Sequence, residues 1–133
     1  MADVLFVCVH NAGRSRMAEA LFARAAGDRY ATASAGTMPA ERPHPEVVAA
    51  LAEIGIDLPE TPGRLLTPEL ADGAQRLISM GCNVEEACPA TTTPMEDWAL
   101  EDPKGKPVER VREIRDDIAR RVEGLVAELD GGR

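Results

Sequence analysis

The apolar residues of this chain follow two different repeats that alternate along the sequence. Residues 4–9 form an unbroken, largely β-branched apolar run, the pattern of a strand buried on both faces of a parallel sheet. Residues 15–26 repeat their apolar side chains at helical spacing, and Gly27 ends the run. The same reading predicts a strand at 30–35, a helix at 46–54, a weaker helix from Thr67 and a strand at 76–80.

The last third of the chain is less regular before it ends in a long helix. Residues 81–94 contain a glycine, two cysteines, two prolines and three consecutive threonines, so an irregular segment is expected there. A short fourth strand is predicted at 98–100. Residues 108–129 form one apolar helical face with charges elsewhere; its apolar positions are Val111, Ile114, Ile118, Val122, Leu125 and Leu129.

This alternation of strands and helices predicts an α/β fold. We expect residues 1–133 to form a single domain, with an open, mainly parallel four-stranded sheet and helices on both faces. Ligand sites of such sheets lie beyond the carboxyl ends of the strands. Cys8, Cys82 and Asp102 each fall at or just after a predicted strand end, so the fold is expected to gather them at one edge.

Composition narrows the possible partners. Lys and Arg total 15 against 23 Asp and Glu, and the net charge of -8 opposes binding to nucleic acid or to anionic membranes. The N-terminus has no basic start, no cleavage-like site and no span of ~20 apolar residues, so a cytoplasmic location is expected. Three cysteines suit working thiols better than a disulfide framework. The cysteines are few and His10 and His44 lack ligand-like spacing to them, so we expect no metal site. We also expect no bound cofactor and a monomer.

The segment between the first strand and the first helix carries the strongest chemical signal. A loop that enters a helix N-terminus directs backbone N–H groups inward and makes a cradle for a tetrahedral oxyanion, and an arginine there can grip two oxygens. The same field stabilises a thiolate at Cys8, to which Ser15 can donate. The alternative is a buried strand cysteine beside a solvated arginine. The predicted oxyanion-binding residues are Val9, His10, Asn11, Ala12, Gly13, Arg14 and Ser15.

With these residues in place, the segment Val4–Phe22 resembles the low-molecular-weight tyrosine phosphatase superfamily, including its arsenate reductase branch. Asp102-Pro103 matches the late acidic loop of that superfamily. The resemblance implies that Cys8 is the nucleophile, assisted by Arg14 and Ser15, and that Asp102 is the general acid that protonates the leaving oxygen.

The two branches differ in how the cysteine adduct is resolved. A phosphatase uses water, whereas a reductase needs a second thiol. Cys82 and Cys88 resemble the resolving cysteines of the reductase branch, and residues 102–106 lack the aromatic residue common in the phosphatases. We therefore favour an arsenate reductase for arsenic detoxification, with a relay from Cys8 through Cys82 to Cys88 and a thioredoxin-like partner. A phosphatase acting on phosphate monoesters and a noncatalytic anion sensor are the alternatives.

The chain departs from the reductase branch at two places, and these departures change what the resemblance implies about a potassium site and about the reductant. Some thioredoxin-linked relatives bind potassium; Asn11, Glu19 and Ser34 match three of the ligands, but Arg64 stands where an acid belongs, so no potassium site is expected. The spacing between Cys82 and Cys88 is one residue shorter than in those relatives. This shortening leaves open glutathione or mycothiol with another redoxin in place of thioredoxin.

Overall fold

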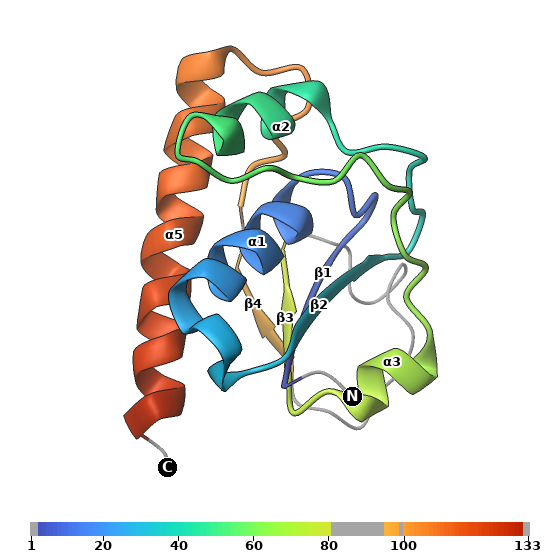
Figure 1. Cartoon of the computed structure of the whole chain (residues 1–133). Coiled ribbons are helices and arrows are strands. Elements are labelled where there is room, and N and C mark those ends of the chain that lie inside the picture. Colours follow the sequence, from blue (N-terminus) through green and yellow to red (C-terminus); the bar gives the residue numbers. More distant parts are fainter. Residues whose placement is uncertain (1–2, 81–94, 99, 132–133) are drawn as a thin grey trace.

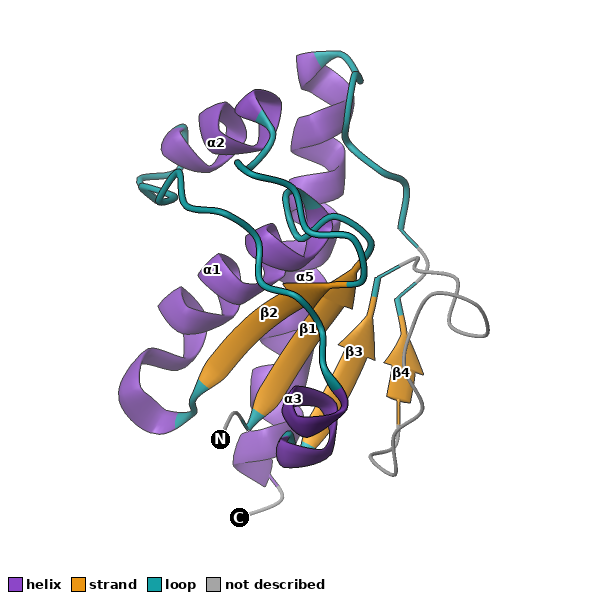
Figure 2. Cartoon of the chain, turned by 90° about the vertical axis from the view of Figure 1, so that its right-hand side faces the viewer, coloured by secondary structure: helices purple, strands orange, loops and turns teal. Residues whose placement is uncertain are grey.

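In the part of the chain that the structure describes, four parallel strands form a single sheet, and their carboxyl ends lie at the same edge (Figures 1 and 2). The computed structural model describes residues 3–80, 95–98 and 100–131. The strand order is β2-β1-β3-β4, with β1 and β3 inside the sheet. The strands are β1 (Val4–Cys8), β2 (Thr32–Gly36), β3 (Arg76–Ser79) and β4 (Met95–Asp97). The predicted parallel α/β architecture is confirmed, with Cys8 at the carboxyl end of a central strand.

Helices cover both faces of the sheet, as predicted. Figure 2 shows α1 and α5 behind the strands and α3 in front of them. Alternate residues of β1 serve the two faces: Phe6 lies in the larger core with α1, α2 and α5, whereas Leu5 and Val7 lie in the smaller core with α3. The helices are α1 (Arg14–Ala26), α2 (Pro45–Ala52), α3 (Pro68–Gly73) and α5 (Val108–Gly131), with a short 3₁₀ turn at Gly27–Arg29.

The helix ends follow the local signals in the sequence. Gly27 has the positive φ of 62° that stops α1, and the Thr67 hydroxyl accepts the N–H of Leu70 at 3.2 Å, which caps α3. These two boundaries confirm the predicted glycine stop and threonine cap. Both depend on contacts within a few residues, which is why they could be read from the chain itself.

The predicted fourth strand at 98–100 is wrong. The ladder with β3 lies at 95–97, and Trp98 follows it, donating its backbone N–H to the carbonyl of Ser79 at 2.8 Å. The Trp98 ring is buried, with its centroid 5.9 Å from that of Phe6. The apolar side chain of Trp98 therefore belongs to the core next to the strand. The strand itself carries the acidic residues Glu96 and Asp97 and lies at the edge of the sheet.

Part of the predicted chemistry lies outside the described residues. The segment 81–94, with Cys82 and Cys88, is in this category. Within the described ranges, no helix combines the length and the apolar character needed to span a membrane.

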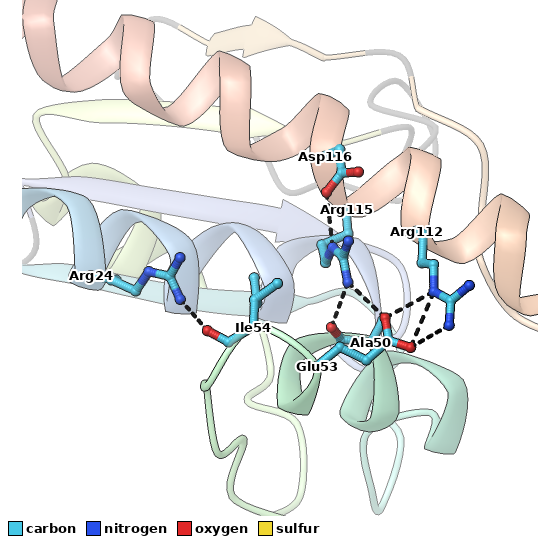
Figure 3. Close-up of polar contacts among 7 residues, drawn as sticks. All are labelled: Arg24, Ala50, Glu53, Ile54, Arg112, Arg115 and Asp116. Atoms are coloured by element: carbon cyan, nitrogen blue, oxygen red, sulfur yellow. Dashed lines mark hydrogen bonds and ion pairs between the residues drawn. The ribbon is translucent and has the colours of Figure 1, made fainter.

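A carboxylate at the end of α2 ties that helix to α5 (Figure 3). Glu53 accepts hydrogen bonds from Arg112 at 2.6 Å and from Arg115 at 2.9 Å. Arg115 is buried and also donates to the carbonyl of Ala50 at 2.8 Å. The hydrogen bonds from Arg112, followed by those from Arg115, lower the pKa of Glu53 to about 2. We call this cluster the Glu53 clamp; it fixes the carboxyl end of α2 against α5.

The lowered pKa of Glu53 makes the clamp a pH-dependent contribution to stability. The folded-state pKa lies below the ordinary value of 4.5, so the contribution is complete above pH 4.5 and is lost as the pH falls toward 2. We expect Glu53→Gln to unfold at a lower urea concentration than the wild type at pH 7, and the two curves to converge near pH 2. Glu123→Gln, on an exposed position of α5, is the control. An equal gap at all pH values would contradict the assignment.

Candidate active site

The loop from β1 to α1 places a thiol beside a helix N-terminus. Cys8, the last residue of β1, is buried, and its Sγ lies 2.9 Å from the Oγ of Ser15 in the first turn of α1. Gly13 precedes the helix and makes no side-chain cap, so the first N–H groups of α1 have no intrahelical acceptor. The thiol, the hydroxyl and these N–H groups therefore meet at one place, as the sequence predicts.

Asn11 holds the loop in an uncommon backbone conformation. Its φ of 48° lies in the left-handed region, which asparagine tolerates better than most residues. Its buried side chain donates from Nδ2 to Ser15 Oγ at 2.8 Å and accepts at Oδ1 from the N–H of Arg64 at 2.9 Å. Asn11 thus connects the segment around Arg64 to the hydroxyl that touches the Cys8 sulfur.

The segment after β2 occupies the outward carbonyls of the same loop. Thr37, Met38, Ala40 and His44 donate their N–H groups to the carbonyls of Cys8, Val9, His10 and Ala12, at 3.3, 2.8, 2.9 and 2.9 Å. Across a trans peptide the carbonyl and the following N–H point in opposite directions, and the described residues contain no cis peptide. Four loop N–H groups therefore point away from the supporting segment: those of Val9, His10, Asn11 and Gly13. This orientation is compatible with the binding of an anion in the loop.

The guanidinium of Arg14 and the carboxylate of Asp102 meet at the same edge. Arg14 is buried and donates to the carbonyl of Leu100 at 3.0 Å, and its Nη2 lies 3.9 Å from Asp102 Oδ2. Asp102 is half-exposed and accepts the N–H of Lys104 at 3.0 Å. The predicted acid therefore stands beside the predicted anion-binding arginine, although the two are far apart in the sequence.

Three residues that were not predicted to contact the loop, His44, Pro103 and Gly36, pack closely against it. His44 and Pro103 each place a carbon atom 3.2 Å from the point that a Cβ on Gly13 would occupy. A Cβ atom on Gly36 would lie only 2.6 Å from the carbonyl oxygen of Val9. No local pattern identifies these contacts, apart from glycine at a strand end in the case of Gly36.

The residues compared above with the potassium ligands of some relatives line a cavity of about 400 Å³. Asn11, Glu19, Ser34 and Arg64 all line it, and Ser34 Oγ donates to Glu19. The cationic side chain of Arg64 in this donor set does not fit a potassium site. In the parts of the chain that the structure describes, no three His, Cys, Asp or Glu side chains come close enough together to hold a metal ion.

One protein family matches nearly the whole length of this chain. The sequence profile of the low-molecular-weight phosphotyrosine protein phosphatases matches residues 3–132. The chain belongs to this family.

Within the low-molecular-weight phosphatase family, the relatives of this chain include arsenate reductases. A protein of Halobacterium salinarum with an arsenate reductase assignment is 44% identical over 131 residues, 94% of this chain and 91% of the relative. The glutaredoxin arsenate reductase of Synechocystis sp. is 35% identical, with coverages of 97% and 99%. The thioredoxin-dependent arsenate reductase of Corynebacterium glutamicum has a TM-score of 0.82 and 34% identity over 98% of this chain and 62% of that chain. The resemblance noted in the sequence is confirmed.

The close approach at Gly36 yields a stability prediction. A methyl group there would meet Val9 O at 2.6 Å and Asn11 N at 2.8 Å, both backbone atoms of the loop. We expect Gly36→Ala to lower the free energy of unfolding by about 1–3 kcal/mol, measured by urea denaturation. Gly124→Ala on α5 is the matched control: its Cβ would meet nothing within 4 Å, and a gain of about 0.4–1 kcal/mol is expected. Equal effects at the two glycines would refute the steric account.

Proposed function

We propose that this protein reduces arsenate to arsenite, with Cys8 as the nucleophile. The observation that carries the proposal is the position of the Cys8 sulfur, 2.9 Å from Ser15 Oγ, at the head of a loop whose N–H groups and arginine suit a tetrahedral oxyanion. The arsenate reductases among the relatives support the choice of arsenate. The residues proposed to bind the oxyanion are those of the loop, from Val9 to Ser15.

In the first step the Cys8 thiolate attacks arsenic. A sulfur–arsenic bond forms as an arsenic–oxygen bond breaks, and the departing oxygen takes a proton from Asp102 and leaves as water. Arg14, within 3.9 Å of Asp102, offsets the negative charge of the bound oxyanion. The arsenic is still pentavalent at this stage.

In the second step a thiolate of Cys82 attacks the sulfur of Cys8. A disulfide forms as the sulfur–arsenic bond breaks, its electron pair passes to arsenic, and trivalent arsenite is released. Cys88 then attacks Cys82, which frees Cys8 and leaves a Cys82–Cys88 disulfide for a redoxin to reduce. Because the cysteines carry the electrons, no bound cofactor is needed. These two roles rest on the sequence, since both residues lie outside the described segments.

The external reductant that we propose is thioredoxin. The Corynebacterium glutamicum reductase is thioredoxin-dependent, whereas the Synechocystis enzyme is named a glutaredoxin arsenate reductase. Glutathione or mycothiol with a redoxin is therefore the second candidate. Hydrolysis of phosphate monoesters, the reaction named by the family, would use the same first step but water in place of Cys82.

Turnover assays separate these functions. We expect the wild type to consume NADPH with arsenate, thioredoxin and thioredoxin reductase, and to hydrolyse an aryl phosphate far more slowly. Cys8→Ser should abolish both activities because it removes the nucleophile. Cys88→Ser should abolish the thioredoxin-coupled activity while sparing the single turnover that releases arsenite. Efficient hydrolysis without arsenate reduction would establish the phosphatase instead, and full activity of Cys88→Ser with thioredoxin would remove it from the relay.

The role of Asp102 predicts a separation of kcat from KM. Asp102→Asn retains the side-chain shape but cannot release a proton, so kcat for arsenate should fall by about 10²- to 10⁴-fold with little change in KM. Asp57→Asn, at an exposed position after α2, is the control. A kcat equal to that of the wild type would mean that another group protonates the leaving oxygen.

A further inference from the structure

His44 lies directly before α2, and its backbone is fixed while its ring is not used for capping. Its N–H donates to the carbonyl of Ala12 at 2.9 Å, and its own carbonyl accepts the N–H groups of Val47 and Val48 at 3.0 and 3.1 Å. As the N-cap residue of α2 it makes no side-chain capping hydrogen bond. Both helix and loop therefore hold the main chain, and the imidazole is left to face the candidate active site.

The His44 imidazole and the loop that carries Asp102 and Pro103 both pack against Gly13. His44 Cδ2 and Pro103 Cγ are each 3.2 Å from the point where a Cβ on Gly13 would stand. Gly13 immediately precedes Arg14, and Pro103 immediately follows Asp102. The ring is therefore a neighbour of the ion pair between Arg14 and Asp102.

Charged groups face His44 from three elements. Asp102 and Lys104 come from the loop before α5, Glu46 from the first turn of α2, and His10 from the β1–α1 loop. Partial burial lowers the pKa of His44 below 6.5, and the negative charges of Asp102 and Glu46 act in the opposite direction. A bound oxyanion would add negative charge beside the ring and so favour the imidazolium.

Asp102 needs a proton source if it is to act as an acid in every turnover. The Asp102 carboxyl group lies 3.9 Å from the Arg14 guanidinium and accepts the N–H of Lys104 at 3.0 Å. Histidine is the side chain that exchanges protons with water in the range around neutral pH. Its placement beside Asp102 offers a route for that proton.

We propose that His44 supplies the proton that Asp102 passes to the departing oxygen. The imidazolium gives its proton through a bridging water to the Asp102 carboxylate, Asp102 gives it to the oxygen that leaves as water, and the neutral imidazole regains a proton from solvent; no electrons change hands. The proposal rests on the proposed function, because the departing oxygen exists only if Cys8 attacks an oxyanion. His44 acts through Asp102 and is a positioning residue for the acid, distinct from the groups that touch the substrate.

The test compares kcat for arsenate reduction in the wild type and His44→Gln across pH. The imidazolium is present on the acid side of its pKa, so the wild-type advantage should be greatest below pH 6.5 and shrink as the pH rises. We expect a loss of roughly 10-fold, smaller than the ~10²-fold or more of a direct general acid, with little change in KM. Thermal unfolding of both proteins, and of His44→Asn as a second variant, shows whether the fold is intact. A loss that is the same at every pH would overturn the proposal.

A double variant gives a second, independent readout. If His44 works through Asp102, adding His44→Gln to Asp102→Asn should cause no further loss of kcat. A full additional loss in that background would show that His44 acts by another route and would refute the relay.

The wild-type assay separates failure of this relay from failure of the proposed function. If the wild type reduces arsenate and His44→Gln has the same pH profile as the wild type, only the relay is refuted. A wild type that hydrolyses phenyl phosphate without reducing arsenate sinks the reductase assignment, and the same comparison then runs on that hydrolysis, where Asp102 protonates the departing phenolate. An enzyme with neither activity overturns both.

Discussion

The side chain of Asn11 joins the parts of the candidate site that must keep a fixed spacing. Its two hydrogen bonds, to the N–H of Arg64 and to the hydroxyl of Ser15, hold a left-handed residue in the middle of the loop. Ser15 in turn meets the Cys8 sulfur. If the amide were absent, the loop would lose the contact that compensates for its backbone conformation, and both the N–H cradle and the hydroxyl would lose their fixed relation to the thiol.

The features that could be read from the sequence are those decided by neighbouring residues. The buried strand ending at Cys8, the helix that stops at Gly27 and the cap at Thr67 each follow from a few consecutive positions. The proximity of Arg14 and Asp102 could be predicted from the topology, since parallel strands bring their carboxyl ends to one edge of the sheet. The family resemblance added roles to these positions.

The features that were missed depend on contacts between distant segments. The N–H of Arg64 that supports Asn11, the ring of His44 against Gly13 and the close approach of Gly36 to Val9 leave no periodic signal in the chain. The position of β4 was predicted wrongly because of Trp98: aromatic side chains are common in strands, but they also occur in core contacts next to a strand. Local pattern thus located the candidate nucleophile, whereas the groups that support it could be identified only from the fold.

The support that the segment 37–44 gives to the loop carbonyls has a consequence for evolution of the family. If this loop binds an oxyanion as proposed, its backbone N–H groups contact the oxygens and not the central atom, so phosphate and arsenate would bind to them in nearly the same way. Discrimination between arsenate and phosphate would then depend on the chemical steps that follow binding. Under the proposed function, a hydrolase and a reductase could share an unchanged loop and differ only in the residues around it, and phosphate would compete with arsenate for that loop.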